Sequence, residues 1–220
     1  MTTRLSFDNE LNILKANLTE MGSLIENAID MSLSAFQNQD YELAKKIIQG
    51  DRTINDIEKT IESRCLSLIL KQQPVARDLR IVTTALKVVT DMERIGDHAA
   101  DIAELVLRVQ GETIYTLVKH IPEMGNVAKK MVREAVNAFT TVNLPKAREI
   151  IKMDDKVDEL FGAVKEEVVR ILRESAEHAD LCVDILMIAK YFERIGDHAV
   201  NICEWTEFYE TGTLNNIRIL

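Results

Sequence analysis

The heptapeptide Glu-Arg-Ile-Gly-Asp-His-Ala stands at residues 93–99 of this chain and returns unchanged at residues 193–199. Both copies lie in long stretches that lack proline and that space their apolar residues three and four positions apart. That spacing places the apolar side chains on one face of an α-helix. Seven identical residues in register within two helical patterns therefore indicate an internal duplication.

The duplication extends outward from the heptapeptide over most of the chain. The Glu-Met-Gly tripeptide at residues 20–22 returns at 123–125, and the helix N-cap residue Asp40 returns as Asn143. These copies are 103 positions apart, whereas the heptapeptides are 100 positions apart. The second repeat has therefore lost three residues between its second and third helices.

Each repeat is predicted to contain three helices. In the first repeat, the apolar stripes indicate helices over residues 11–35, 40–70 and 74–111, the last beginning at a proline and ending at a glycine. In the second repeat, the stripe of the first helix is repeated over residues 114–138. Helices of about 30 residues are about 45 Å long, so each bundle is expected to be elongated.

These helices predict an all-α fold of two tandem, sequence-related three-helix bundles with long antiparallel helices. The chain has only 8 Gly and 3 Pro, too few for the many tight turns of a β-sandwich or a β-barrel. Short connections between the helices favour antiparallel neighbours. We place the first bundle at residues 1–111, the second at residues 112–210 and a C-terminal tail at residues 211–220.

The composition restricts the partners and the compartment of the protein. The formal net charge is -9, which argues against nucleic acid as the main partner because the phosphate backbone would be repelled. The cysteines Cys65, Cys182 and Cys203 form no CxxC pair and are expected to be reduced thiols. The sequence shows no signal peptide and no apolar run of about 20 residues. We therefore expect a cytoplasmic protein that reaches a membrane only through partners.

Acidic side chains four residues apart follow one face of each third helix, beside the apolar seam. Like charges at this spacing destabilise a helix by about 0.2–0.5 kcal/mol per pair, and a bound cation would remove that repulsion. Each second helix adds a further pair of oxygen-bearing side chains four residues apart, and antiparallel packing would bring the pairs together. The candidate metal ligands are Asp51, Asn55, Glu93, Asp97 and Asp101 in the first bundle and Asp154, Asp158, Glu193, Asp197 and Asn201 in the second.

Carboxylate and amide oxygens are hard ligands that suit Mg²⁺, Ca²⁺, Mn²⁺ or iron, and suit Zn²⁺ less well. The simpler interpretation is a solvated acidic helix face, but its recurrence at equivalent positions favours metal binding. The motif histidines, His98 and His198, point about 100° away from the preceding aspartates and are expected to pack or to support the site. Gly96 and Gly196 indicate a close helix approach or room for an ion.

The duplicated heptapeptides, the Gln-Gln-Pro-Val-Ala-Arg-Asp-Leu-Arg loop at residues 72–80 and the two three-helix repeats resemble the PhoU family of bacterial phosphate-regulon proteins. The resemblance covers nearly the whole chain. It implies that the ten candidate ligands form metal-binding surfaces, which hold multinuclear iron clusters in some family members. Asn55 and Asn201 stand where carboxylates are possible. Oxygen ligands alone leave Mg²⁺, Mn²⁺, Ca²⁺ and Zn²⁺ open.

The resemblance also implies regulation rather than catalysis. The expected function is negative regulation of phosphate uptake and of the phosphate-starvation response. The protein would act as an adaptor between the ATPase subunit of the phosphate ABC transporter and a phosphate-sensing histidine kinase, and long amphipathic helices make a homodimer plausible. Two alternatives stay open: a carboxylate-bridged di-metal enzyme or ferritin-like protein, whose Glu-x-x-His spacing is absent here, and a metal-free helical scaffold.

Overall fold

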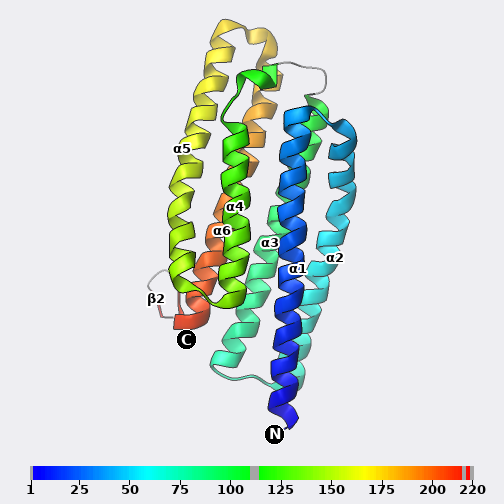
Figure 1. The fold of residues 1–220 in the computed structure, drawn as a ribbon, viewed down its shortest axis with the longest axis vertical. Coiled ribbons are helices and arrows are strands. Elements are labelled where there is room, and N and C mark those ends of the chain that lie inside the picture. Colours follow the sequence, from blue (N-terminus) through cyan, green and yellow to red (C-terminus); the bar gives the residue numbers. More distant parts are fainter. Residues whose placement is uncertain (1, 110–113, 215–216, 219–220) are drawn as a thin grey trace.

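The computed structural model describes residues 2–109, 114–214 and 217–218, and these residues form six long helices (Figure 1). The predicted all-α fold of two three-helix repeats is confirmed. The boundary expected between residues 111 and 112, including the terminating Gly111, lies outside the described residues. The helices are α1 (Thr2–Asn38), α2 (Tyr41–Gln72) and α3 (Arg77–Arg108) in the first repeat, and α4 (Ile121–Thr141), α5 (Leu144–Glu174) and α6 (Ala179–Thr211) in the second.

The two predicted N-caps start the second helix of each repeat. Asp40 accepts a hydrogen bond from the backbone N–H of Leu43 at 2.9 Å, and Asn143 accepts one from the backbone N–H of Lys146 at 3.1 Å. Each cap satisfies a backbone donor that has no partner within the helix. The equivalence of the two repeats therefore holds at the level of local hydrogen bonding as well as of sequence.

Three predicted helix starts were wrong. Helix α1 begins at Thr2, nine residues before the predicted start at residue 11. The first helix of the second repeat begins at Ile121 rather than at residue 114, and residues Ile114–Leu117 form a short 3₁₀ helix instead. Pro122 has no N–H to donate to residue 118 and is tolerated only in a first helical turn, so a helix cannot run through it from residue 114. The third helix of the first repeat begins at Arg77 rather than at Pro74. Gln73 closes α2 with a positive φ of 44°, so Pro74 lies in the connection between the helices.

The predicted tail is partly structured. Helix α6 continues to Thr211, where Gly212 ends it with a positive φ of 74° and donates its N–H to the Phe208 carbonyl at 2.8 Å. A short antiparallel pair follows, formed by β1 (Thr213–Leu214) and β2 (Ile217–Arg218). None of the described helices combines the length and the apolarity needed to cross a bilayer.

The two repeats pack side by side through α1 against α4 and α3 against α6, and share one apolar core (Figure 1). A Cβ atom on Gly22 in α1 would lie 2.8 Å from Cγ1 of Val136 in α4. A Cβ atom on Gly125 in α4 would lie 2.9 Å from Cδ1 of Leu33 in α1. The two glycines are 103 positions apart, as are the two side chains that they contact. The same glycine contact is therefore made twice between the repeats. At both places the helices can approach this closely because glycine has no side chain.

The Gly22→Leu variant is expected to be less stable than the wild type by about 1–3 kcal/mol, because Val136 is β-branched and has little freedom to move. Thermal and denaturant unfolding would measure the change. The matched control is Gly162→Leu, since a Cβ atom at that exposed position in α5 would contact nothing within 4 Å. The control gains helix propensity, and its stability is expected to stay level or to rise by about 0.8 kcal/mol. Equal effects at the two positions would contradict a tight interface at Gly22.

Candidate metal centres

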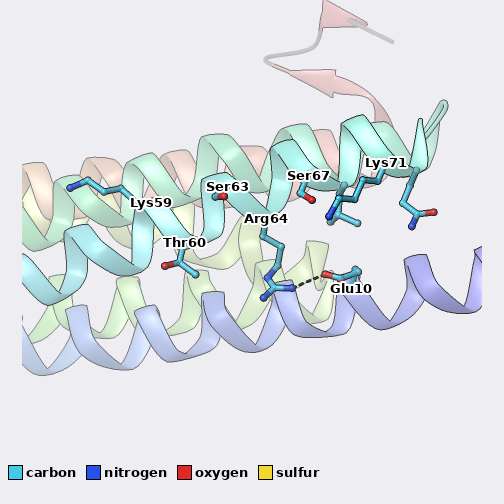
Figure 2. A pocket seen from close by; sticks show the side chains of 9 residues that line it. Glu10, Lys59, Thr60, Ser63, Arg64, Ser67 and Lys71 are labelled. Carbon is cyan, nitrogen blue, oxygen red and sulfur yellow. Dashed lines mark hydrogen bonds and ion pairs between the residues drawn. The ribbon is translucent and has the colours of Figure 1, made fainter.

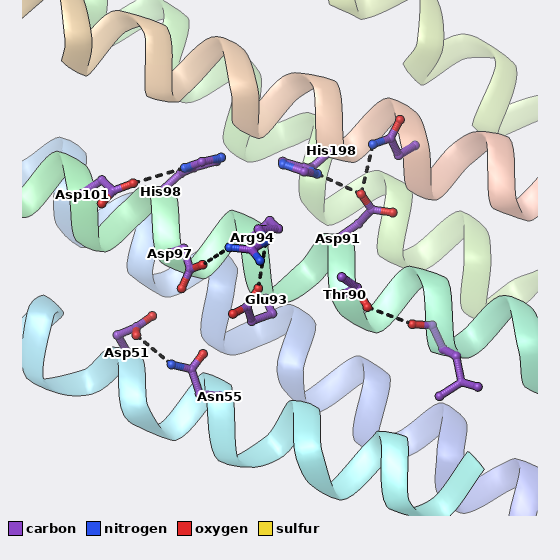
Figure 3. Close-up of polar contacts among 12 residues, drawn as sticks. Asp51, Asn55, Thr90, Asp91, Glu93, Arg94, Asp97, His98, Asp101 and His198 are labelled. Carbon is purple, nitrogen blue, oxygen red and sulfur yellow. Dashed lines mark hydrogen bonds and ion pairs between the residues drawn. The ribbon is translucent and has the colours of Figure 1, made fainter. Parts of the chain in front are cut away.

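The first candidate centre, called the first cluster, lies between α2 and α3 (Figure 3). Asp51 and Asn55 come from α2, and Asn55 Nδ2 donates a hydrogen bond to Asp51 Oδ2 at 3.0 Å. Glu93 and Asp97 face them from α3, close enough that the Asp97 charge acts on both Asp51 and Glu93. The antiparallel packing of the two helices therefore brings the acidic pairs together.

Arg94 supplies the positive charge at the rim of the first cluster. Its Nη1 atom donates to Asp97 Oδ2 at 3.0 Å, and its Nε atom lies 3.4 Å from Glu93 Oε2. The Arg94 side chain is more than half exposed, so these ion pairs are open to water. Arg94 therefore compensates part of the acidic charge through a contact that is easily exchanged for another cation.

The carboxylates of the first cluster hold their protons more tightly than ordinary acids. Burial and, after it, the neighbouring Asp97 charge raise the pKa of Glu93 to about 7. The same two causes raise the pKa of Asp51, although the hydrogen bond from Asn55 acts in the opposite direction. The cluster thus carries more negative charge than its surroundings stabilise, which is the electrostatic condition that favours a bound cation.

The second cluster repeats this arrangement between α5 and α6. Asp154 and Asp158 lie on α5, and Glu193 and Asp197 lie on α6, where Lys190 forms an ion pair with Glu193. Burial, and then the charges of Asp197, Asp158 and Glu193, raise the pKa of Asp154 to about 6. The four acids therefore interact with one another, as their counterparts do in the first repeat.

The two motif glycines have different neighbours. A Cβ atom on Gly196 would lie 3.0 Å from Asp154 Oδ1, so this glycine leaves room for the carboxylate at the second cluster. A Cβ atom on Gly96 would lie 3.0 Å from Cδ1 and Cγ2 of Ile54, so this glycine lets α2 and α3 approach closely. The close helix approach predicted from the sequence is found at Gly96, whereas room for an ion at Gly196 stays a prediction.

Across the described ranges of the chain, four buried oxygen atoms of the clusters have no hydrogen-bond partner: Asp51 Oδ1, Asn55 Oδ1, Asp154 Oδ1 and Glu193 Oε2, the last of which forms the ion pair with Lys190. Asp51 and Asp154 are equivalent positions of the two repeats. A buried acceptor without a partner costs about 1–3 kcal/mol, so its presence calls for an explanation such as an ion. Among the described residues, no three His, Cys, Asp or Glu side chains are already arranged to hold a metal ion. The carboxylate and amide oxygens present are the donor types that a hard cation prefers.

The outermost candidate ligands of the two repeats lie differently. Asp101 stays beside the first cluster, where its charge acts on Asp51, whereas Asn201 turns toward the other repeat. Asp101 Oδ2 lies 3.3 Å from His98 Nδ1, and Asn201 Nδ2 donates to Asp91 Oδ1 at 3.0 Å (Figure 3). Asp91 lies on α3, so Asn201 faces the first repeat rather than α5. The reason is that four residues exceed one helical turn by about 40°, and two such steps rotate a stripe by about 80°. Asn201 is thus separated from the other second-cluster candidates.

The motif histidines pack where α3 meets α6, as their rotation away from the motif aspartates predicts. Their ring centroids are 5.5 Å apart, and His98 also stacks on Tyr191 at 5.3 Å. His198 Nδ1 lies 2.8 Å from Asp91 Oδ1. Sequence reasoning missed Asp91 and Tyr191, although they are exactly equivalent residues 100 positions apart and precede the two motifs. The available signal was their position two residues before the heptapeptide.

The fold and the clusters define a class of protein: a duplicated helical bundle with an acidic cluster in each half. The PhoU domain family matches this chain twice, at residues 18–106 and 121–206. This chain belongs to the PhoU family. The family consists of regulatory accessory proteins.

Named relatives and solved structures agree with this membership. A phosphate-specific transport system accessory protein PhoU homolog of Clostridium acetobutylicum is 41% identical over 211 residues, which cover 96% of each chain. The Escherichia coli accessory protein PhoU is 31% identical over 94% of this chain and 86% of its own length. The crystal structure of PhoU from Pseudomonas aeruginosa is 32% identical with a TM-score of 0.87, and covers 94% of this chain and 100% of that one.

The metal-free protein is expected to lose stability between about pH 4.5 and pH 7 in a way that depends on Glu93. The folded state raises the pKa of Glu93 from 4.5 to about 7, so it binds the proton more tightly than the unfolded chain does. This contribution to stability is complete below pH 4.5 and is lost as the pH rises through 7. The free energy of unfolding of the chelator-treated wild type and of Glu93→Gln should be measured across this range. The wild type is expected to become less stable relative to the variant as the pH rises. A constant difference would contradict the assignment.

Proposed function

We propose that this protein is a negative regulator of phosphate uptake and of the phosphate-starvation response that acts in the cytoplasm as a metal-binding adaptor. Membership of the PhoU family supports the regulatory part, because the relatives are named accessory proteins of the phosphate-specific transport system. The observation that carries the metal-binding part is the pair of equivalent buried oxygens, Asp51 Oδ1 and Asp154 Oδ1, which have no partner inside their acidic clusters.

The first repeat would hold metal through Asp51, Asn55, Glu93, Asp97 and Asp101, and the second through Asp154, Asp158, Glu193 and Asp197. A bound cation would supply positive charge to carboxylates whose folded environment raises their pKa. It would also join α2 to α3 and α5 to α6, because each cluster draws its side chains from two helices. Iron is the expected metal from the family resemblance, and the oxygen donors equally suit Mg²⁺, Mn²⁺ or Ca²⁺.

As an adaptor, the protein would link the ATPase subunit of the phosphate ABC transporter to the phosphate-sensing histidine kinase. The long helices support this role because they present extended faces on a rigid shared core. No reaction is required of such a protein. A change in metal occupancy would alter how firmly the helices of each repeat are joined, and the partners would respond to the resulting surface.

The double variant Asp97→Ala with Asp197→Ala is expected to lose most of the metal that the wild type carries after purification without a His-tag. Elemental analysis and the rise in unfolding temperature on adding metal would measure the loss. Asp56→Ala with Asp155→Ala is the matched control, because it removes the same charge from exposed positions of α2 and α5. The metal hypothesis fails if the wild type holds no metal, or if the control loses as much as the double variant. Oxygen consumption by the metal-loaded protein would instead support the alternative of a di-metal enzyme.

Purified wild-type protein is expected to bind the transporter ATPase subunit, the cytoplasmic part of the sensor kinase, or both. Calorimetry or surface plasmon resonance with phosphate scarce and abundant would measure the affinities. The reason for the expectation is that the relatives are named accessory proteins of this transport system. If the protein binds neither the ATPase subunit nor the kinase, with phosphate scarce and with phosphate abundant, the adaptor proposal is wrong whatever the metal content.

A further inference from the structure

We propose that the outward face of α2 near its C-terminal end binds an acidic, amphipathic segment of a protein partner. We call this surface the α2 face; it consists of Lys59, Glu62, Ser63, Leu66, Ser67, Leu70 and Lys71, so its two lysines stand near its ends and outnumber its one carboxylate. The inference rests on the proposed adaptor function and names the surface and the chemistry of the partner. It concerns a part of the molecule that the acidic clusters do not use.

The α2 face borders a groove of about 700 Å³ between α2 and α1 (Figure 2). Three cations line it, Lys59, Arg64 and Lys71, against the single carboxylate of Glu10. Arg64 Nη1 already donates to Glu10 Oε2 at 2.6 Å, which holds the guanidinium against α1. Lys59 and Lys71 form no hydrogen bond or ion pair within the described part of the chain. The groove is thus a cationic strip on a chain of net charge -9.

Two features favour a protein segment over a small anion. Lys59 and Lys71 are twelve residues apart on one helix, a rise of about 18 Å, so one phosphate ion could meet only one of them. Between them, Leu66 and Leu70 are 53% and 77% exposed and lie one turn apart. Exposed leucines add nothing to the binding of an inorganic anion, but they would anchor apolar side chains of a peptide. A segment with carboxylates near its ends and apolar residues between them matches both features.

The second repeat lacks this surface, although the helix that carries it is duplicated. At the offset of 103 positions, the counterparts of Lys59, Ser63, Arg64 and Lys71 are Gly162, Glu166, Glu167 and Glu174. The counterparts of Ser67 and Leu70 are Arg170 and Arg173, so the order of charged and apolar residues is not kept. The fold of the repeat therefore does not require the cationic strip, because α5 forms without it. A single cationic strip would bind one partner segment per chain and would give the two ends of the duplicated molecule different roles.

Charge reversal and removal of the leucines test the proposal on the full-length protein. Lys59→Glu with Lys71→Glu, and separately Leu66→Ser with Leu70→Ser, should each weaken binding to the transporter ATPase subunit or the kinase cytoplasmic part at least tenfold. The matched controls are Lys87→Glu, an exposed lysine on α3, and Val183→Ser with Met187→Ser, an exposed apolar pair on α6. The controls should bind as the wild type does, and wild-type binding should weaken with salt.

A photo-crosslinker on Ser63→Cys, at an exposed position of the α2 face, locates the partner segment, since Cys65, Cys182 and Cys203 are buried. The expected crosslink falls in a partner segment that combines acidic and apolar residues. A crosslink to a second copy of this chain overturns the proposal. The proposal is also overturned if tripolyphosphate acting at the α2 face displaces the partner and no acidic segment is crosslinked. If the wild type binds a partner and the variants bind it equally well, only this inference fails. If the wild type binds neither partner, the adaptor function fails with it.

Discussion

The structure depends on the close approach of α1 and α4 at Gly22 and Gly125. Each glycine accepts a side chain of the opposite repeat, and the two contacts are related by the same offset of 103 positions. Because helices without side chains at the crossing approach closely, the two repeats share one core instead of folding as separate bundles. The same packing sets α3 against α6 and leaves the acidic side of each heptapeptide facing the second helix of its own repeat.

The acidic clusters are a consequence of that arrangement. A helix that is buried on one side by the other repeat and on another by its neighbour leaves its flanking carboxylates half-buried, where water stabilises their charge poorly. The raised pKa values of Glu93 and Asp154 express this cost, and Arg94 and Lys190 offset part of it. The packing of the core therefore keeps the carboxylates of each cluster close together and poorly solvated, and a bound cation would reduce the repulsion between them.

Duplication gave the protein two similar repeats. Equivalent positions that carry different residues indicate features that belong to one repeat only. At the α3–α6 contact, Asp91 pairs with His198 while its counterpart Tyr191 stacks on His98, so the two histidines have different surroundings. The α2 face is a second departure, since the counterparts of Lys59 and Lys71 in the other repeat are Gly162 and Glu174. Differences of this kind can persist because neither is needed to fill the shared core.

The sequence by itself determined the fold class, the three helices of each repeat, the N-caps and the acidic stripes, because each follows from local hydrogen bonding and from the 3.6-residue period. It did not determine the start of the shorter helix at Ile121 or of the helix at Arg77, since single backbone positions near Pro122 and Gln73 decide them. Only the tertiary structure decided which stripe members meet. Residues spaced by four rotate gradually around a helix, and this rotation turns Asn201 toward the other repeat. The sequence does not show which helix lies on that side, so only the packed structure identifies the neighbour of Asn201.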